Sequence, residues 1–156
     1  MKVHELLSEG LVIPEILSQE RDPALEEIAR HLKNNDKVVD EAELYKKLVE
    51  REKLSSTSIG RGVAIPHCKM KGAESPLLAL AVSPKGVHFE APDGKLTHLF
   101  FLAVSSLEDP RQNLQILACV AHLVRRASSL PKRIMAVKDP GKILEIIREE
   151  EEKLKG

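Results

Sequence analysis

A histidine that follows a proline at the end of a short apolar run carries the clearest chemical signal in this chain. His67 comes after the apolar residues 63–65 and Pro66. The apolar residues predict a brief buried strand, and the proline ends its hydrogen-bond ladder, so we expect the imidazole at a strand tip. A neutral imidazole is a nucleophile near physiological pH, since its unperturbed pKa is about 6.5. His67 is therefore a candidate acceptor and donor of a phosphoryl group.

The segment before this histidine has residue types that suit an anion. Phosphoryl transfer depends on cations or N–H donors that stabilise the three equatorial oxygens. Ser56 and Thr57 offer hydroxyl groups, and Gly60 and Gly62 let backbone amides approach an anion closely. We therefore expect these four residues to form a phosphoryl-binding loop.

An arginine and an asparagine complete the set of candidates. Arg51 can add a planar, permanently charged fork, and Arg61 is the competing arginine, inside the loop itself. Asp109 and Pro110 predict the start of a helix, which puts Asn113 in the first turn, where free N–H groups favour an anion. Its amide can donate a hydrogen bond but cannot become cationic.

Residues 51–69 resemble the active-site signature of the type 2 IIA domains of the bacterial sugar phosphotransferase system, the fructose, mannitol and nitrogen-regulatory group. That signature has Ser-Thr, a glycine pair, and an apolar-Ala-apolar-Pro-His run before a small residue, which here is Cys68. Weaker similarity extends over nearly the whole chain. Members of the family commonly carry a second histidine at the position that Asn113 occupies here.

The resemblance implies a phosphotransferase that works as a phosphohistidine relay. His67 would accept a phosphoryl group on Nε2 from the histidine phosphocarrier protein and pass it to a cysteine of a IIB component or use it as a regulatory signal. Arg51 would help neutralise the phosphoryl group, and position 113 would flank it. No metal or organic cofactor is implied. The resemblance also implies a stand-alone IIA protein, serving either a separate sugar permease or nitrogen regulation, and the sequence leaves that choice open.

A second interpretation is a regulatory protein-binding module of the same fold with weakened or lost phosphoryl transfer. Asn113 is the residue that favours it. Ser-His hydrolysis is a third and more distant interpretation, because the chain has no GxSxG elbow. A metal site is not expected at His67 and Cys68, since adjacent strand residues project to opposite faces and no HxxH or CxxC accompanies them.

The elements that must position these residues can be outlined from periodicity and capping. Apolar runs predict strands at residues 63–65, 77–82 and 99–104, and a short edge strand at 87–90. Helices are expected from Asp22-Pro23, from Asp40 to near Arg51, from Asp109-Pro110 to about Arg126, and from Asp139-Pro140, with residues 148–153 as a solvated face or frayed tail. This order predicts an α/β fold, a three-layer α/β/α sandwich with a mixed sheet between helices.

Composition narrows the class of protein. With 156 residues and 42% hydrophobic content, one domain over residues 1–156 is expected. Lys plus Arg and Asp plus Glu number 24 each and aromatics are 3%, which argues against a nucleic-acid partner. The chain shows no leader or membrane span, so we expect a cytoplasmic protein that is at most peripheral to a membrane permease, with both cysteines reduced.

Overall fold

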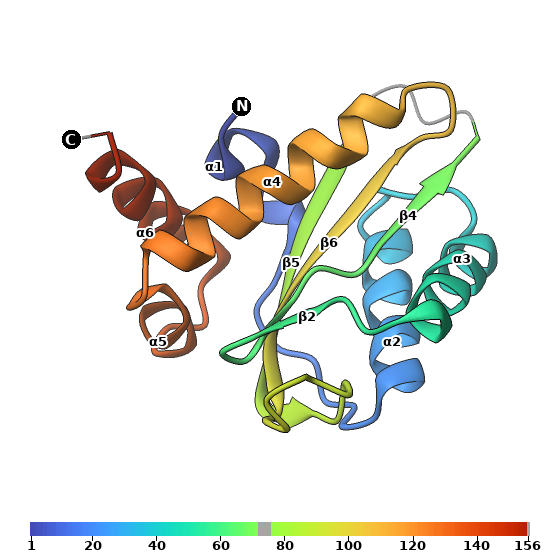
Figure 1. Cartoon of the computed structure of the whole chain (residues 1–156), viewed down its shortest axis with the longest axis horizontal. Helices are drawn as coiled ribbons and strands as arrows, with labels where there is room; N and C mark the ends of the chain where they lie inside the picture. The colour runs from blue at the N-terminus through green and yellow to red at the C-terminus, as the bar shows by residue number, and fades with distance from the viewer. Residues whose placement is uncertain (72–75, 156) are drawn as a thin grey trace.

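Two long apolar strands form the centre of the sheet in the computed structural model, which describes residues 1–71 and 76–155 (Figure 1). β5 (Leu77–Val87) and β6 (Thr97–Ser106) pair antiparallel, with Leu80 opposite Phe101. Because side chains alternate along a strand, β6 sends Phe101 to one face and Phe100 to the other. Apolar side chains on both faces require a helical layer on each side.

Helices supply those two layers (Figure 1). One face is covered by α2 (Arg21–Asn34) and α3 (Glu41–Leu54). The opposite face is covered by α1, α4, α5 and α6, which span Val3–Leu6, Pro110–Arg126, Leu130–Met135 and Pro140–Lys153. The predicted three-layer α/β/α sandwich is therefore confirmed.

Short strands extend the central pair on both sides. The order is β1 (Val12–Ile13), β5, β6, β3 (Val63–Ala64) and β2 (Ser58–Gly60), and β4 (His67–Met70) also pairs with β6. β1 runs parallel to β5, and β3 and β4 run parallel to β6, whereas β5 with β6 and β2 with β3 are antiparallel. The six-stranded sheet is mixed, as predicted.

The structure corrects the prediction for the segment that leads to His67. β3 ends at Ala64, so Ile65 lies outside the strand, and His67 opens β4 instead of standing at a strand tip. A proline removes only its own N–H donor. The carbonyl oxygen of Pro66 still accepts a hydrogen bond from the Ala103 amide at 2.9 Å, and His67 lies opposite Ala103 in the parallel register. The ladder thus resumes directly after the proline.

Aspartate side chains cap three of the four predicted helices. Asp40 accepts a hydrogen bond from the amide three residues later at 3.0 Å, and Asp109 and Asp139 accept from the amide two residues later at 3.1 Å. The prediction for α2 is wrong, because this helix begins at Arg21, before the expected cap. There the Asp22 carboxylate binds the Arg21 side chain, with 2.8 Å between Oδ1 and Nε.

The C-terminal helix also differs from the prediction of a solvated or frayed tail. Glu150 and Glu151 are buried. The Glu151 carboxylate accepts hydrogen bonds from the backbone amides of Val3 and His4, each at 2.8 Å. The first helix, α1, therefore packs against the end of α6.

The predicted edge strand at residues 87–90 is wrong as well. Val87 is the last residue of β5, and His88 forms only an isolated bridge with Glu20. Glu90 has a φ of 56°, a left-handed conformation that interrupts an extended backbone. Within residues 1–71 and 76–155, no helix has the length and apolar character needed to cross a membrane.

Candidate functional site

The imidazole of His67 is held by one hydrogen bond at each ring nitrogen. Nδ1 lies 2.8 Å from the carbonyl oxygen of Ile65, and Nε2 lies 3.3 Å from Nε of Arg51. A carbonyl oxygen can only accept, so Nδ1 carries the hydrogen in the neutral ring and Nε2 keeps its lone pair. The arginine N–H donates to that lone pair. Nε2 is thus the nucleophilic atom, on the side of the ring that faces Arg51.

The surroundings of His67 keep its ring neutral. Burial lowers the pKa of the imidazole below its ordinary value of 6.5, and the positive charges of Arg51 and Lys69 lower this pKa further. The hydrogen bond to the Ile65 carbonyl opposes these effects, but burial is the largest of them. His67 is therefore uncharged and nucleophilic at physiological pH.

Arg51 lies in the last turn of α3, because this helix continues to Leu54 and does not end near Arg51 as predicted. Its Nη1 donates to the carbonyl oxygen of Ser55 at 3.1 Å, while Nε donates to His67. A guanidinium has five N–H donors. The contacts among the described residues use two of them, which leaves donors available for the oxygens of an anion bound at His67.

Asn113 reaches the same pocket from the first turn of α4, where the sequence places it. Its side chain is only 8% exposed, and its Oδ1 lies 3.5 Å from Oγ of Ser105 on β6. With Oδ1 turned towards that hydroxyl, the NH₂ group is the part of the amide left for the pocket. Arg51, His67 and Asn113 together line one pocket of about 520 Å³.

The other residues that line this pocket make it basic. They are Lys47, Glu50, Leu54, Cys68 and Lys69. Arg51 and the two lysines are cationic, and Glu50 is the carboxylate among the lining residues. Such a pocket suits a dianionic group such as a phosphoryl.

The four residues of the expected phosphoryl-binding loop do not line this pocket. Oγ of Ser56 donates to the Phe89 carbonyl at 2.9 Å. Thr57 donates to the buried Glu52 carboxylate through its amide at 3.0 Å and through its hydroxyl. Both hydroxyl groups thus hold the chain between α3 and β2.

Gly60 and Gly62 lie at the turn between β2 and β3, with φ values of 81° and 78°. The turn precedes β3, whereas His67 follows it. Five residues at ~3.3 Å each put Gly62 and His67 roughly 17 Å apart along an extended chain. The glycines therefore serve the hairpin. The structure brings together Arg51, His67 and Asn113 and leaves the loop residues apart from them.

Two residues of the pocket were missed in the sequence. Lys69 is two residues after His67 on a strand, and Lys47 is four residues before Arg51 on a helix. Both spacings put side chains on a common face. Periodicity within the elements could therefore have found both lysines, once His67 and Arg51 were chosen.

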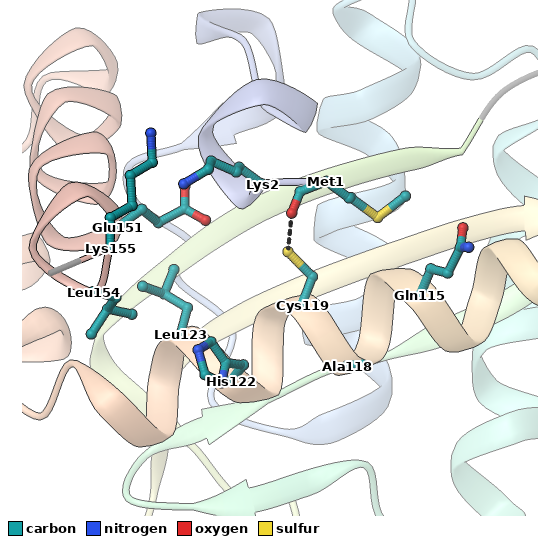
Figure 2. Close-up of a pocket in the computed structure, with 10 residues that line it drawn as sticks. All are labelled: Met1, Lys2, Gln115, Ala118, Cys119, His122, Leu123, Glu151, Leu154 and Lys155. Atoms are coloured by element: carbon teal, nitrogen blue, oxygen red, sulfur yellow. Dashed lines mark hydrogen bonds between the residues drawn. The ribbon is translucent and has the colours of Figure 1, made fainter.

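A second pocket, of about 570 Å³, lies where the N-terminus meets α4 and the end of α6 (Figure 2). Sγ of Cys119 donates to the Met1 carbonyl at 3.4 Å there. Burial raises the pKa of the Cys119 thiol, which disfavours the reactive thiolate. Glu151 is occupied by the amides of α1. Among the described residues no group of three His, Cys, Asp or Glu side chains could hold a metal ion. The His67 pocket, which combines a nucleophile with three cations, is the candidate site.

Known proteins share sequence similarity with most of this chain. Residues 5–150 match the family described as "Phosphoenolpyruvate-dependent sugar phosphotransferase system, EIIA 2". The chain is 30% identical over 149 residues to the PTS system fructose-specific EIIABC component of Bacillus subtilis, covering 96% of this chain and 23% of that protein. It is 30% identical over 127 residues to the nitrogen regulatory protein of Pseudomonas aeruginosa, covering 81% of this chain and 82% of that protein.

A solved structure shows the same fold. The crystal structure of the nitrogen regulatory protein IIA-Ntr from Neisseria meningitidis superposes with a TM-score of 0.80 at 26% identity. The match covers 93% of this chain and 98% of that one. The fold similarity thus extends over nearly the whole chain, whereas the chain spans less than a quarter of the multi-component fructose protein.

Proposed function

Because this chain belongs to the EIIA 2 family of the phosphoenolpyruvate-dependent sugar phosphotransferase system, we propose that it carries a phosphoryl group on Nε2 of His67. The observation that carries the proposal is the pair of hydrogen bonds at the ring. Ile65 takes the Nδ1 hydrogen, which leaves the Nε2 lone pair for nucleophilic attack in a pocket with three cations.

The transfer step follows from this geometry. The donor protein supplies a phosphohistidine that is protonated on its other ring nitrogen. The Nε2 lone pair attacks the phosphorus of this group, the new N–P bond forms, and the donor's N–P bond breaks. The electron pair of that bond returns to the donor imidazole, which leaves as a neutral ring. His67 keeps its Nδ1 hydrogen and becomes a phosphoimidazolium, whose positive charge is stabilised by the Ile65 carbonyl. Arg51 turns its N–H groups from Nε2 to the phosphoryl oxygens.

The donor in this proposal is the histidine phosphocarrier protein, and the acceptor is a cysteine of a IIB component. The B. subtilis relative supports such an acceptor, since its name joins A, B and C components in one protein. No metal or organic cofactor takes part, and a cytoplasmic location suits a carrier that meets both partners in solution.

Intact mass measurement after incubation with phosphoenolpyruvate and the general phosphotransferase proteins tests the proposal. We expect one phosphoryl adduct at neutral or alkaline pH that is lost in acid, as phosphohistidine requires. The adduct should persist in His122→Ala, because His122 is exposed on α4, and disappear in His67→Ala. No adduct on the wild-type protein, or an adduct retained by His67→Ala, would overturn the proposal.

A regulatory role is the second candidate, and Asn113 is the observation that favours it. The neutral amide of Asn113 stands where the family commonly has another histidine. Because the amide cannot supply a positive charge, it would slow phosphoryl transfer and lengthen the lifetime of the phosphorylated protein. Several relatives are named nitrogen regulatory protein. Mixing the loaded protein with a IIB component separates the two roles. Rapid loss of the adduct to the acceptor indicates a relay, whereas a stable adduct that changes binding of a target protein indicates regulation.

A further inference from the structure

Lys69 is a cation in the His67 pocket, and it lies next to Asn113, whose amide is neutral. In the parallel register of β4 and β6, Lys69 lies opposite Ser105, two positions along from His67 and Ala103. Ser105 is also the residue whose hydroxyl holds the Asn113 amide. Lys69 and Asn113 are therefore neighbours across the same serine, on the strand side and the helix side of the pocket.

The faces of the sheet agree with this arrangement. Ala103 belongs to the core under α4, whereas Val104 and Cys68 belong to the core under α2 and α3. Alternation along β4 then puts His67 and Lys69 on the α4 side and Cys68 on the other. Lys69 lines the pocket with His67, and its charge acts on the imidazole. Its exposed side chain leaves the ammonium group free to reach a group bound at Nε2.

The negative charge of a bound phosphoryl group needs a cation such as Lys69 nearby. A phosphoryl group brings about two negative charges and spreads them over three oxygens. Arg51 can serve one side of it, but Asn113 offers only a neutral N–H donor, and Glu50 adds a carboxylate to the lining. This inference rests on the proposed function. We propose that Lys69 is a catalytic residue that contacts the transferring phosphoryl group and supplies a cation from β4, in addition to those of Arg51 and Lys47 on α3.

Loading by a small phosphoryl donor isolates this role from protein docking. Phosphoramidate can phosphorylate an imidazole without any partner protein. We expect Lys69→Met to slow loading from phosphoramidate by about tenfold, less than the ~100-fold that a buried, preorganised donor supplies, because Lys69 is exposed. Lys69→Arg should keep most of the rate. Lys46→Ala is the matched control, since this exposed lysine on α3 does not line the pocket.

A second substitution tests whether a cation at position 113 can replace the charge of Lys69. Adding Asn113→His to Lys69→Met should restore more of the lost rate at pH 6 than at pH 8, because a larger fraction of the new imidazole is protonated at the lower pH. A merely structural lysine would show no such pH-dependent rescue. Urea midpoints of each variant close to that of the wild type confirm that the fold is intact.

Three results would overturn the inference. Loading of Lys69→Met from phosphoramidate at the wild-type rate shows that the lysine does not act on the phosphoryl group. A defect seen with the protein donor but not with phosphoramidate assigns the lysine to docking instead. A wild-type protein that accepts phosphoryl from neither donor overturns the proposed function, and this inference with it, whereas a defect confined to Lys69 variants leaves the proposed function standing.

Discussion

The two hydrogen bonds at the ring of His67 have different effects on its nucleophilic nitrogen. The Ile65 carbonyl selects the tautomer, and Arg51 faces the nitrogen that must attack. Burial and the nearby positive charges keep the ring neutral, which a nucleophile requires. The same arginine that lowers the pKa of His67 can bind the phosphoryl oxygens once the N–P bond has formed.

Titration of His67 should show the neutral ring directly. We expect the NMR midpoint of its ring protons below 6.5, because burial disfavours the imidazolium. Below about pH 6.5 the unfolded chain binds the proton more readily than the folded one, so the free energy of unfolding should decrease as the pH falls through this window. In urea unfolding, His67→Gln should weaken that pH dependence. A midpoint at or above 6.5 would contradict the burial argument.

Removal of the arginine should harm transfer more than removal of the lysine. We expect Arg51→Met to slow loading from phosphoramidate by about 100-fold, because a partly buried donor beside the reacting atom is lost. Arg51→Lys should recover only part of the rate, since an ammonium lacks the planar fork. Arg30→Met, which changes an exposed arginine paired with Glu26 on α2, is the control and should load normally.

Among the elements, the end of α6 holds the start of the chain in place. The buried Glu151 carboxylate accepts from the amides of Val3 and His4 and also lies 2.6 Å from Nδ1 of His4. These amides belong to the first turn of α1, whose N–H groups have no partner within the helix. One glutamate of a charged run is thus the cap of a helix almost the whole chain away in sequence.

Loss of this cap should destabilise the protein. We expect Glu151→Ala to lower the free energy of unfolding by about 2 to 4 kcal/mol, since it leaves buried amide groups without acceptors. Glu152→Ala is the neighbouring control and should cost under about 1 kcal/mol, because its partner Arg148 lies on the surface. Urea denaturation measures both, and hydrogen exchange at the amides of Val3 and His4 should speed up only in Glu151→Ala.

For the molecule as a whole, β6 contributes side chains to both hydrophobic cores, and its pairing with β4 fixes the position of His67. Phe101 and Ala103 pack under α4, while Phe100 and Val104 pack under α2 and α3. The strand also pairs with β4, so the position of His67 depends on both cores. Cys68, next to His67, is buried in the second of them.

The rate at which a thiol reagent labels Cys68 should measure how often the protein unfolds. Burial raises the pKa of its thiol to about 12, so almost no thiolate exists at pH 8. In a Cys119→Ser background we expect labelling by a disulfide reagent to be slow in the native protein and fast in urea. The native rate should follow the stability measured by denaturation when core variants are compared. Fast labelling without denaturant would contradict the buried position.

His67, Arg51 and Asn113 could be chosen from the sequence because local patterns place them and because they match positions of a family signature. The Pro-His run, the helix that Asp40 begins and the helix that Asp109 begins are all encoded within a few residues. The glycine pair has an equally local signal, but its conformation suits both a hairpin turn and an anion loop. Residue types alone could not separate these two uses.

Amino-acid sequence by itself determined the layers, three of the four predicted aspartate caps, and three of the residues that line the pocket. Periodicity and capping are short-range properties, which is the reason they can be read locally. Tertiary structure alone decided that the glycines lie away from His67, that Glu151 caps α1, and that Lys69 faces Asn113 across Ser105. These contacts join segments distant in the chain, so they exist only after the register of β6 with β4 and the packing of α1 on α6 are set.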